Sequence, residues 1–202
     1  TPTLTSTTPN SRCDAGSVTL NATSSAGNTV WYSLPSGGTA LATTNSFVTP
    51  SISLTTTYYV QATLGSCSSS RTAVIATVNT TPIITSTTPN SRCDAGSVTL
   101  NAVANAGTIN WFSVPSGGSS VATGTSFTTP SISSTTIYYV EATSGTCTSV
   151  RTAVTATVNT TPTITSTTPS SRCDAGTVTL SASSSAGNVV WYANSTGGTS
   201  LA

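Results

Sequence analysis

Short runs of alternating apolar and polar residues recur along the chain, separated by turns rich in Gly, Pro, Ser and Asn. One such run, SVTLNA, places Val18, Leu20 and Ala22 on one face, which is the period-two pattern of a half-buried β-strand. Many of these runs carry β-branched residues and few carry strong helix formers. The pattern therefore predicts an all-β protein.

Seven short strands are predicted between Thr1 and Thr80. They are expected at Leu4–Ser6, Ser17–Ala22, Thr29–Ser33, Thr39–Ala42, Ser46–Thr49, Thr56–Thr63 and Thr72–Val78. A Trp in the third strand and a Tyr near the start of the sixth are predicted to point into the core. The core positions in all copies are Trp31, Trp111, Trp191, Tyr58 and Tyr138. This arrangement predicts an antiparallel immunoglobulin-like (fibronectin III-like) β-sandwich.

A long internal repeat determines how the chain is organised. Residues 1–80 align with 81–160 without a gap, and 24 of the 80 positions differ. We expect Ig-like repeats at 1–80 and 81–160, and an incomplete third repeat at 161–202 that contains only the equivalents of the first three or four of these strands. A period this long fits a string of folded domains better than a solenoid. The joint VNTTP has no Gly-rich run and predicts a short, fairly stiff linker.

The motif SRCDAG opens each repeat, at residues 11–16, 91–96 and 171–176. Its cysteine precedes another cysteine at the same spacing in both full copies, so we expect the disulfides Cys13–Cys67 and Cys93–Cys147. Closing such a loop would stabilise each domain by about 4 kcal/mol. Cys173 would pair near position 227, outside this chain. Disulfides indicate an oxidising, extracytoplasmic setting, whereas a zinc site or a catalytic thiol lacks the His residues it needs.

The composition argues against several classes of function. Charged residues make up 4% of the chain and the net charge is +1, so nothing attracts nucleic acid or an anionic membrane. No apolar run approaches the ~18 residues of a membrane span. The acidic residues are Asp14, Asp94, Glu141 and Asp174. They are too few for paired-carboxylate catalysis, and the chain has no His for a triad. We therefore expect a non-enzymatic protein without a cofactor.

Several polar and aromatic residues keep more than one interpretation. Asp14 either pairs with Arg12 or Arg71 or caps a turn, and the alternative is a weak Ca²⁺ site at the domain joint. Aromatic residues predicted to face outward form either cross-strand pairs or a platform for a sugar or protein partner. They are Tyr32, Tyr59, Phe112, Tyr139 and Tyr192. Glycosylation sequons occur at Asn21, Asn79, Asn159 and Asn194, and they matter only where Asn is glycosylated.

The motifs C-x-x-G-x-V-T-L, W-Y/F, YYV and C-x-S-x-R-T-A-V resemble the Ig-like repeats of very large secreted surface proteins of Bacteroidetes. Such repeats often lie upstream of type IX secretion or gliding-associated sorting domains. The resemblance covers both full copies and the half copy. It implies an exported, extracellular or cell-surface protein, such as a long adhesin used in gliding.

These observations lead to one expected function and two alternatives. We expect tandem repeats that contact their neighbours in the chain and form an extended stalk or filament, which holds other domains away from the cell. One alternative is a module that binds surface glycans or another partner through the outward aromatic residues. The other is lateral self-association with other copies into a filament or sheath.

Overall fold

The computed structural model describes residues 1–201. All the regular secondary structure assigned within these residues is β-strand. The first repeat contains β1 (Leu4–Thr8), β2 (Asn10–Cys13), β3 (Thr19–Ser24), β4 (Asn28–Tyr32), β5 (Ala42–Thr43), β6 (Ser46–Val48), β7 (Thr56–Leu64), β8 (Cys67–Ser68) and β9 (Thr72–Asn79). The second contains β10 (Ile84–Thr88), β11 (Asn90–Cys93), β12 (Thr99–Ala104), β13 (Thr108–Phe112), β14 (Ala122–Thr123), β15 (Ser126–Thr128), β16 (Thr136–Ser144), β17 (Cys147–Thr148) and β18 (Thr152–Asn159). Residues 161–201 contain β19 (Ile164–Thr168) and β20 (Ser181–Ser184).

Each complete repeat is a sandwich of two sheets. In the first repeat one sheet has the order β1-β3-β6, and the other has the order β2-β9-β7-β4-β5 with β8 paired to β7. The second repeat has the same order in β10-β12-β15 and β11-β18-β16-β13-β14, with β17 paired to β16. This is the immunoglobulin-like architecture that the strand pattern predicts, so the predicted fold class is confirmed.

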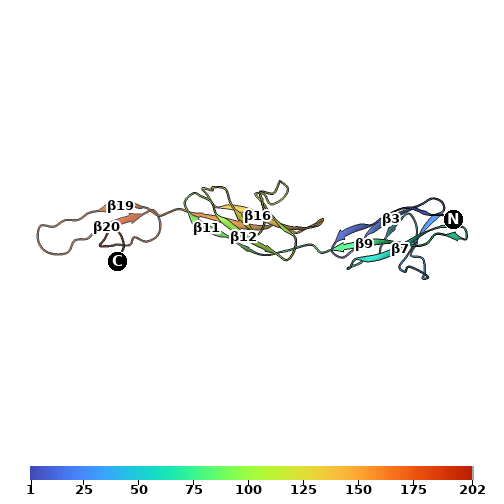
Figure 1. Cartoon of the computed structure of the whole chain (residues 1–202). Helices are drawn as coiled ribbons and strands as arrows, with labels where there is room; N and C mark the ends of the chain where they lie inside the picture. The colour runs from blue at the N-terminus through green and yellow to red at the C-terminus, as the bar shows by residue number, and fades with distance from the viewer. Residues whose placement is uncertain (202) are drawn as a thin grey trace.

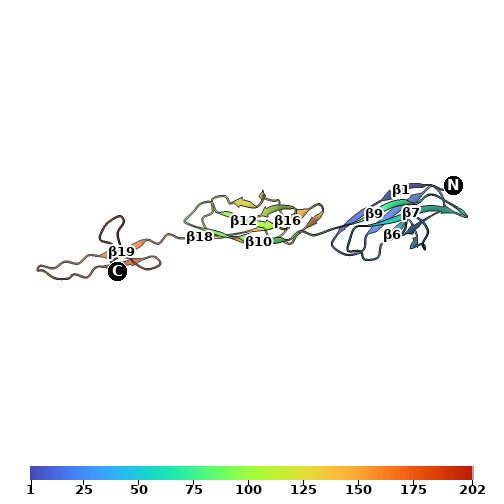
Figure 2. The ribbon, with the colours of Figure 1, turned by 60° about the horizontal axis from the view of Figure 1, so that its bottom comes forward.

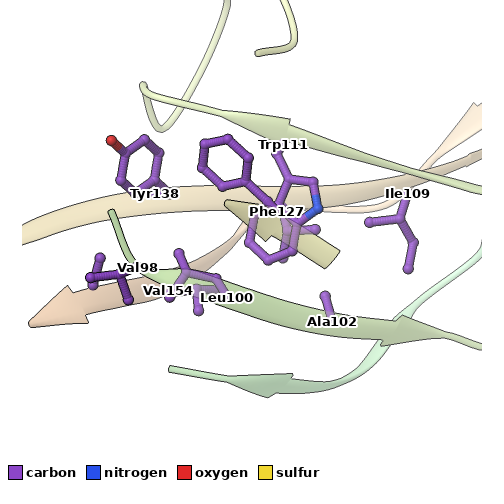
Figure 3. Close-up of a cluster of buried hydrophobic side chains, with 10 residues drawn as sticks. Val98, Leu100, Ala102, Ile109, Trp111, Phe127, Tyr138 and Val154 are labelled. Carbon is purple, nitrogen blue, oxygen red and sulfur yellow. The ribbon is translucent and has the colours of Figure 1, made fainter. Parts of the chain in front are cut away.

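The core of each complete repeat is built around the predicted Trp and Tyr. Trp31 has no exposed surface and stacks on Phe47 with ring centroids 5.3 Å apart, and Phe47 meets Tyr58 edge to face at 5.2 Å. The indole N–H of Trp31 donates to the carbonyl of Thr44 at 2.8 Å, which satisfies its polar group inside the core. Figure 3 shows the equivalent cluster around Trp111 and Tyr138 in the second repeat.

Trp191 does not occupy a core of this kind, so its assignment as a core residue is corrected. It is only half-buried, and Val178, Leu180 and Tyr192 near it in the sequence are 45%, 50% and 53% exposed. The physical reason is that β19 and β20 pair only with each other. In the complete repeats the Trp is covered by a second sheet, and the described residues 161–201 form none.

The position of the SRCDAG motif is set by a strand that was not predicted from the sequence, β2. β2 pairs with β9 in parallel, with Asn10 opposite Ala76 and Cys13 opposite Asn79. β11 pairs with β18 in the same register. The third copy of the motif, at residues 171–176, forms no strand although its sequence is identical. The motif therefore becomes a strand only where the last strand of its own repeat supplies the backbone hydrogen bonds.

The repeats follow one another along a line, as two views of the ribbon show (Figures 1 and 2). Only four residues separate β9 from β10. Within this linker, the side chain of Pro82 is fully buried. A short linker whose proline is packed into the next domain has few conformations, in agreement with the stiff joint expected from the sequence. No described helix is long and apolar enough to cross a membrane.

Candidate functional site

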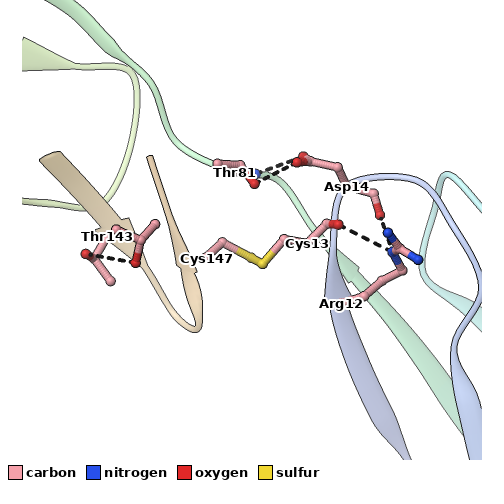
Figure 4. The surroundings of a disulfide bond; sticks show 7 residues. Arg12, Cys13, Asp14, Thr81, Thr143 and Cys147 are labelled. Atoms are coloured by element: carbon pink, nitrogen blue, oxygen red, sulfur yellow. Dashed lines mark hydrogen bonds between the residues drawn. A yellow bond between two sulfur atoms is a disulfide. The ribbon is translucent and has the colours of Figure 1, made fainter. Parts of the chain in front are cut away.

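The joint between the first two repeats contains a disulfide that crosses from one domain to the other (Figure 4). Cys13 of the first repeat bonds Cys147 of the second, with the two Cα atoms 5.6 Å apart and a sequence separation of 134. Cys67, Cys93 and Cys173 are free and exposed. The predicted bonds Cys13–Cys67 and Cys93–Cys147 are therefore wrong. The expected partner of Cys173 near position 227 lies outside this chain and stays a prediction.

Cys13 and Cys67 lie at opposite ends of the first sandwich, which is why the predicted bond between them cannot form. Cys13 is aligned with Asn79, where β9 leaves the domain, whereas Cys67 follows β7 beyond Thr72, where β9 begins. The eight residues of β9 span roughly 23 Å at about 3.3 Å per residue. A disulfide requires Cα atoms about 4.4–6.8 Å apart, so Cys13 and Cys67 cannot meet within one domain. Each complete repeat instead carries one cysteine at each end.

We call Cys13, Cys93 and Cys173 the motif cysteines, because they belong to SRCDAG, and Cys67 and Cys147 the turn cysteines. The turn cysteines follow β7 and β16, in the turn that leads to the last strand of each repeat. Cys147 is 1% exposed, whereas its equivalent Cys67 is exposed. A head-to-tail arrangement of repeats thus brings the motif cysteine of one repeat to the turn cysteine of the next.

The motif is folded around the side chain of Arg12. Its Nε donates to the carbonyl of Asp14 at 3.1 Å and its Nη1 donates to the carbonyl of Ser17 at 3.1 Å. Gly16 lies directly under the guanidinium, and a Cβ there would fall 1.9 Å from Nη1. The backbone of Gly16 also exchanges two hydrogen bonds with Ile52. Arg12 and Gly16 therefore hold the loop after Cys13 in a single shape and aim the thiol at the joint.

Asp14 is the second contact across the joint. Its backbone adopts φ 59°, a left-handed conformation that Asp tolerates better than most residues. In this conformation its carboxylate accepts hydrogen bonds from the Thr81 N–H at 3.0 Å and from the Thr81 hydroxyl at 2.7 Å. Asp14 therefore holds the linker residue Thr81, instead of pairing with Arg12 or Arg71 or capping a turn as expected from the sequence.

These hydrogen bonds predict a specific pH dependence of the joint. The Thr81 hydroxyl and then the Thr81 N–H hold the pKa of Asp14 below its ordinary value of 3.8, because both stabilise the ionised carboxylate. A lowered pKa means that the stabilisation is present above 3.8 and is lost as the pH falls through the folded-state pKa. We expect the Thr81 amide resonance to titrate with a midpoint below 3.8 in an NMR pH series. Asp14→Asn should abolish that titration, and a midpoint at or above 3.8 in the unmodified chain would contradict the contact.

The linker also closes the joint by apolar contact. A shallow groove beside the disulfide is lined by Pro82 and Ile83 from the linker and by Ser149 and Val150 near the turn cysteine. Pro82 is fully buried there, whereas Ile83 is 56% exposed and Val150 is 86% exposed. The described residues contain no group of three or more His, Cys, Asp or Glu side chains that could hold a metal ion. The disulfide, the Asp14–Thr81 contact and the linker residues of this groove together connect the two repeats.

The outward aromatic residues form cross-strand pairs that an arginine covers. Tyr32 lies opposite Tyr59, and the Arg71 guanidinium sits 3.3 Å from the centroid of the Tyr32 ring. Arg71 also donates to the carbonyls of Leu34 and Gly37 at 2.6 and 2.7 Å, which holds the turn after β4. The cation–π contact contributes about 0.5–1 kcal/mol at such a site.

In the second repeat the same arrangement buries one aromatic residue that was expected to face solvent. Phe112 lies opposite Tyr139, is 6% exposed and has the Arg151 guanidinium 3.4 Å from its ring centroid. Arg151 is held there by a 2.9 Å ion pair with Glu141. The expectation for Phe112 is therefore corrected. Tyr192 is 53% exposed, as expected for an outward residue.

Comparison with known protein families now assigns the chain to a family. The sequence model of a family described as "Ig-like domain CHU_C associated" matches residues 1–79 and again residues 80–159. The chain belongs to this Ig-like family. The family assignment agrees with the resemblance seen in the motifs, and families with this fold are generally non-enzymatic. A search of curated proteins finds no match.

Solved structures similar to this Ig-like chain include a marsupial T cell receptor, with a TM-score of 0.52 and 10% identity over 84% of this chain and 78% of the other. A chain in the crystal structure of a mouse coronavirus receptor-binding domain complexed with its murine receptor has a TM-score of 0.49 and 14% identity over 74% of this chain and 98% of the other. Sidekick-1 immunoglobulin domains 1–4 have a TM-score of 0.35 and 19% identity, over 78% of this chain and 51% of the other. At these identities the T cell receptor supports the fold alone.

Proposed function

We propose that this Ig-like chain is a structural, non-enzymatic module of an exported surface protein, in which consecutive repeats form a stiff stalk. The stalk holds other parts of the protein away from the cell. The family association with CHU_C points to secreted or cell-surface proteins, and a disulfide is stable in an oxidising, extracytoplasmic setting. The single observation that carries the proposal is the disulfide between repeats.

The stiffness follows from how the two domains are connected. A single peptide linker between domains leaves bending and twisting free unless the interface is large. Here a second covalent connection, Cys13–Cys147, runs beside the linker. Between these two covalent links, Asp14 holds the linker through Thr81, and Pro82 packs into the second repeat. Two separated covalent links remove the hinge motions that one link permits.

A neutral surface suits this role. Charged side chains form 4% of the residues, and Ser and Thr are frequent throughout the sequence. Such a surface gives little non-specific ionic attraction to other macromolecules. The aromatic residues that were considered as a ligand platform are partly covered by Arg71 and Arg151, which supports cross-strand stabilisation as their role.

The experiment that tests the stalk is small-angle X-ray scattering on the 202-residue chain and two variants. Cys13→Ser removes the bond between repeats, and we expect its maximum dimension to fall and its distance distribution to broaden. Cys93→Ser is the matched control, because it changes the same motif at a cysteine that is free in this chain. We expect the control to scatter like the unmodified chain.

Circular dichroism should show the same β-structure in all three proteins, because each complete repeat keeps its own core. If Cys13→Ser remains as extended and as narrowly distributed as the unmodified chain, the disulfide is not what stiffens the joint, and the proposal fails in this form.

A further inference from the structure

The free cysteines of the first two repeats occupy the same positions as the bonded ones. Cys93 is the motif cysteine of the second repeat, the equivalent of Cys13, and Cys67 is the turn cysteine of the first, the equivalent of Cys147. Cys93 lies at the end of its domain from which the linker leaves, and Cys67 lies at the opposite end of its own domain. Both thiols are exposed, so they are accessible to an adjoining domain.

The strand register and the Asp–Thr contact beside Cys93 are the same as at the bonded joint. Cys93 lies opposite Asn159 in the register of Cys13 and Asn79, and the Asp94 N–H donates to the carbonyl of Asn159 at 2.7 Å. Asp94 has φ 61°, and its carboxylate accepts hydrogen bonds from the N–H and the hydroxyl of Thr161. The Asp–Thr contact that holds the linker at the first joint is therefore also made at the second, whereas Pro162, the equivalent of the buried Pro82, is exposed.

We propose that Cys93 and Cys67 are half-joints, each of which bonds the complementary cysteine of an adjoining Ig-like repeat. The rule is that the motif cysteine of one repeat bonds the turn cysteine of the repeat that follows it. For Cys93 the partner is a turn cysteine, and for Cys67 it is a motif cysteine. This inference rests on the joint of the proposed stalk. It predicts that the disulfide observed at one joint is repeated at every joint of the array.

The bond forms by oxidation of two thiols. Two S–H groups lose two protons and two electrons, and one S–S bond is made. The acceptor is a small-molecule disulfide such as glutathione disulfide, which is reduced to two thiols in the same exchange.

The adjoining repeat has two chemical sources, another repeat in the same polypeptide or a second copy of the chain. The geometry favours a repeat in the same polypeptide. At the observed joint the linker contact of Asp14 with Thr81 lies beside the disulfide, so the peptide connection and the bond belong to one structure. At the second joint Asp94 holds Thr161, and residues 161–201 start where the next repeat belongs.

The test extends the 202-residue chain by a copy of residues 123–160, which supplies the third repeat with the strands that the second repeat has there. The protein is refolded with reduced and oxidised glutathione, and free thiols are alkylated. Trypsin cleaves after Arg12, Arg71, Arg92, Arg151 and Arg172, because these are the only basic side chains before the extension. We expect one disulfide-linked species of three fragments, which are residues 13–71, residues 93–151 and the fragment that begins at Cys173 and contains the added copy of Cys147.

The controls assign each link. Cys93→Ser should release the third fragment and leave the first two joined, whereas Cys67→Ser should leave all three joined. A third fragment that is released without this substitution, with Cys93 alkylated, overturns the inference. If that fragment is released while residues 13–71 and 93–151 stay joined, the stalk joint survives and only the extension of the rule fails.

Bonding to a second copy of the chain is tested with the 202-residue chain, without the extension. A non-reducing gel over a range of concentrations should show monomer, because residues 161–201 occupy the second joint. Disulfide-linked oligomers that contain a Cys67–Cys93 bond between copies would support the half-joints but identify a second copy as the partner. Oligomers linked through other pairs, such as Cys67–Cys67, would overturn the pairing rule.

Discussion

Trp111→Ala is expected to destabilise the second repeat by about 3–5 kcal/mol, the usual cost of removing a buried aromatic side chain. Trp111 has no exposed surface, lies beside Phe127 with ring centroids 5.5 Å apart and donates its indole N–H to the carbonyl of Gly124 at 2.9 Å. A domain of this size is stable by only about 5–10 kcal/mol. The substitution therefore removes a large share of the stability of the repeat.

The chain supplies its own control for this experiment. Trp191→Ala makes the same change at the equivalent position of the third repeat, where the side chain is half-buried and no second sheet covers it. We expect it to leave the unfolding of the two complete repeats unchanged within about 0.5 kcal/mol. Urea denaturation followed by Trp fluorescence and circular dichroism measures both. Equal losses in the two variants would contradict the difference in burial.

A non-reducing tryptic digest of the oxidised 202-residue chain is expected to release residues 13–71 and 93–151 as one linked species. The digest separates the two pairing schemes completely, because Cys13 and Cys67 fall in one fragment and Cys93 and Cys147 fall in the other. Bonds within each repeat would leave the fragments apart. The bond between repeats joins them, and mass spectrometry after alkylation should find three modified thiols, at Cys67, Cys93 and Cys173.

Single variants check the assignment of that bond. Cys147→Ser should separate the two fragments, whereas Cys67→Ser should leave them joined, although the two positions are equivalent in their repeats. Fragments that run apart in the unmodified chain, each without a free thiol, would restore the pairing within repeats and refute the observed joint.

The sequence carried enough local information to predict the strands and the core of each complete repeat. Alternation marked β3, β7 and β9, and the Trp in β4 identified the inner face, because side chains of a strand alternate between solvent and core. The repeat period was visible directly in the letters. Expectations of this kind depend on residues that are neighbours in one strand or on copies that can be compared.

The pairing of β2 with β9 could not be predicted in the same way. The run Asn10–Cys13 is polar and short, and nothing in it alternates. It becomes a strand because β9 offers backbone groups beside it, and the identical motif at residues 171–176 forms no strand where the described residues 161–201 have no equivalent of β9. A strand defined by backbone pairing with a distant segment leaves no period in its own side chains.

The equal spacing between motif and turn cysteines in the two complete repeats suggested a bond within each repeat. A signal for the correct bond was present, because the observed separation of 134 equals that spacing plus one repeat period, but sequence separation alone cannot distinguish the two. The composition, the repeats and the immunoglobulin-like core followed from local patterns of side chains. The partner of Cys13 was decided only in three dimensions, because β2 runs parallel to β9 and so carries the thiol to the end of the domain where the next repeat begins.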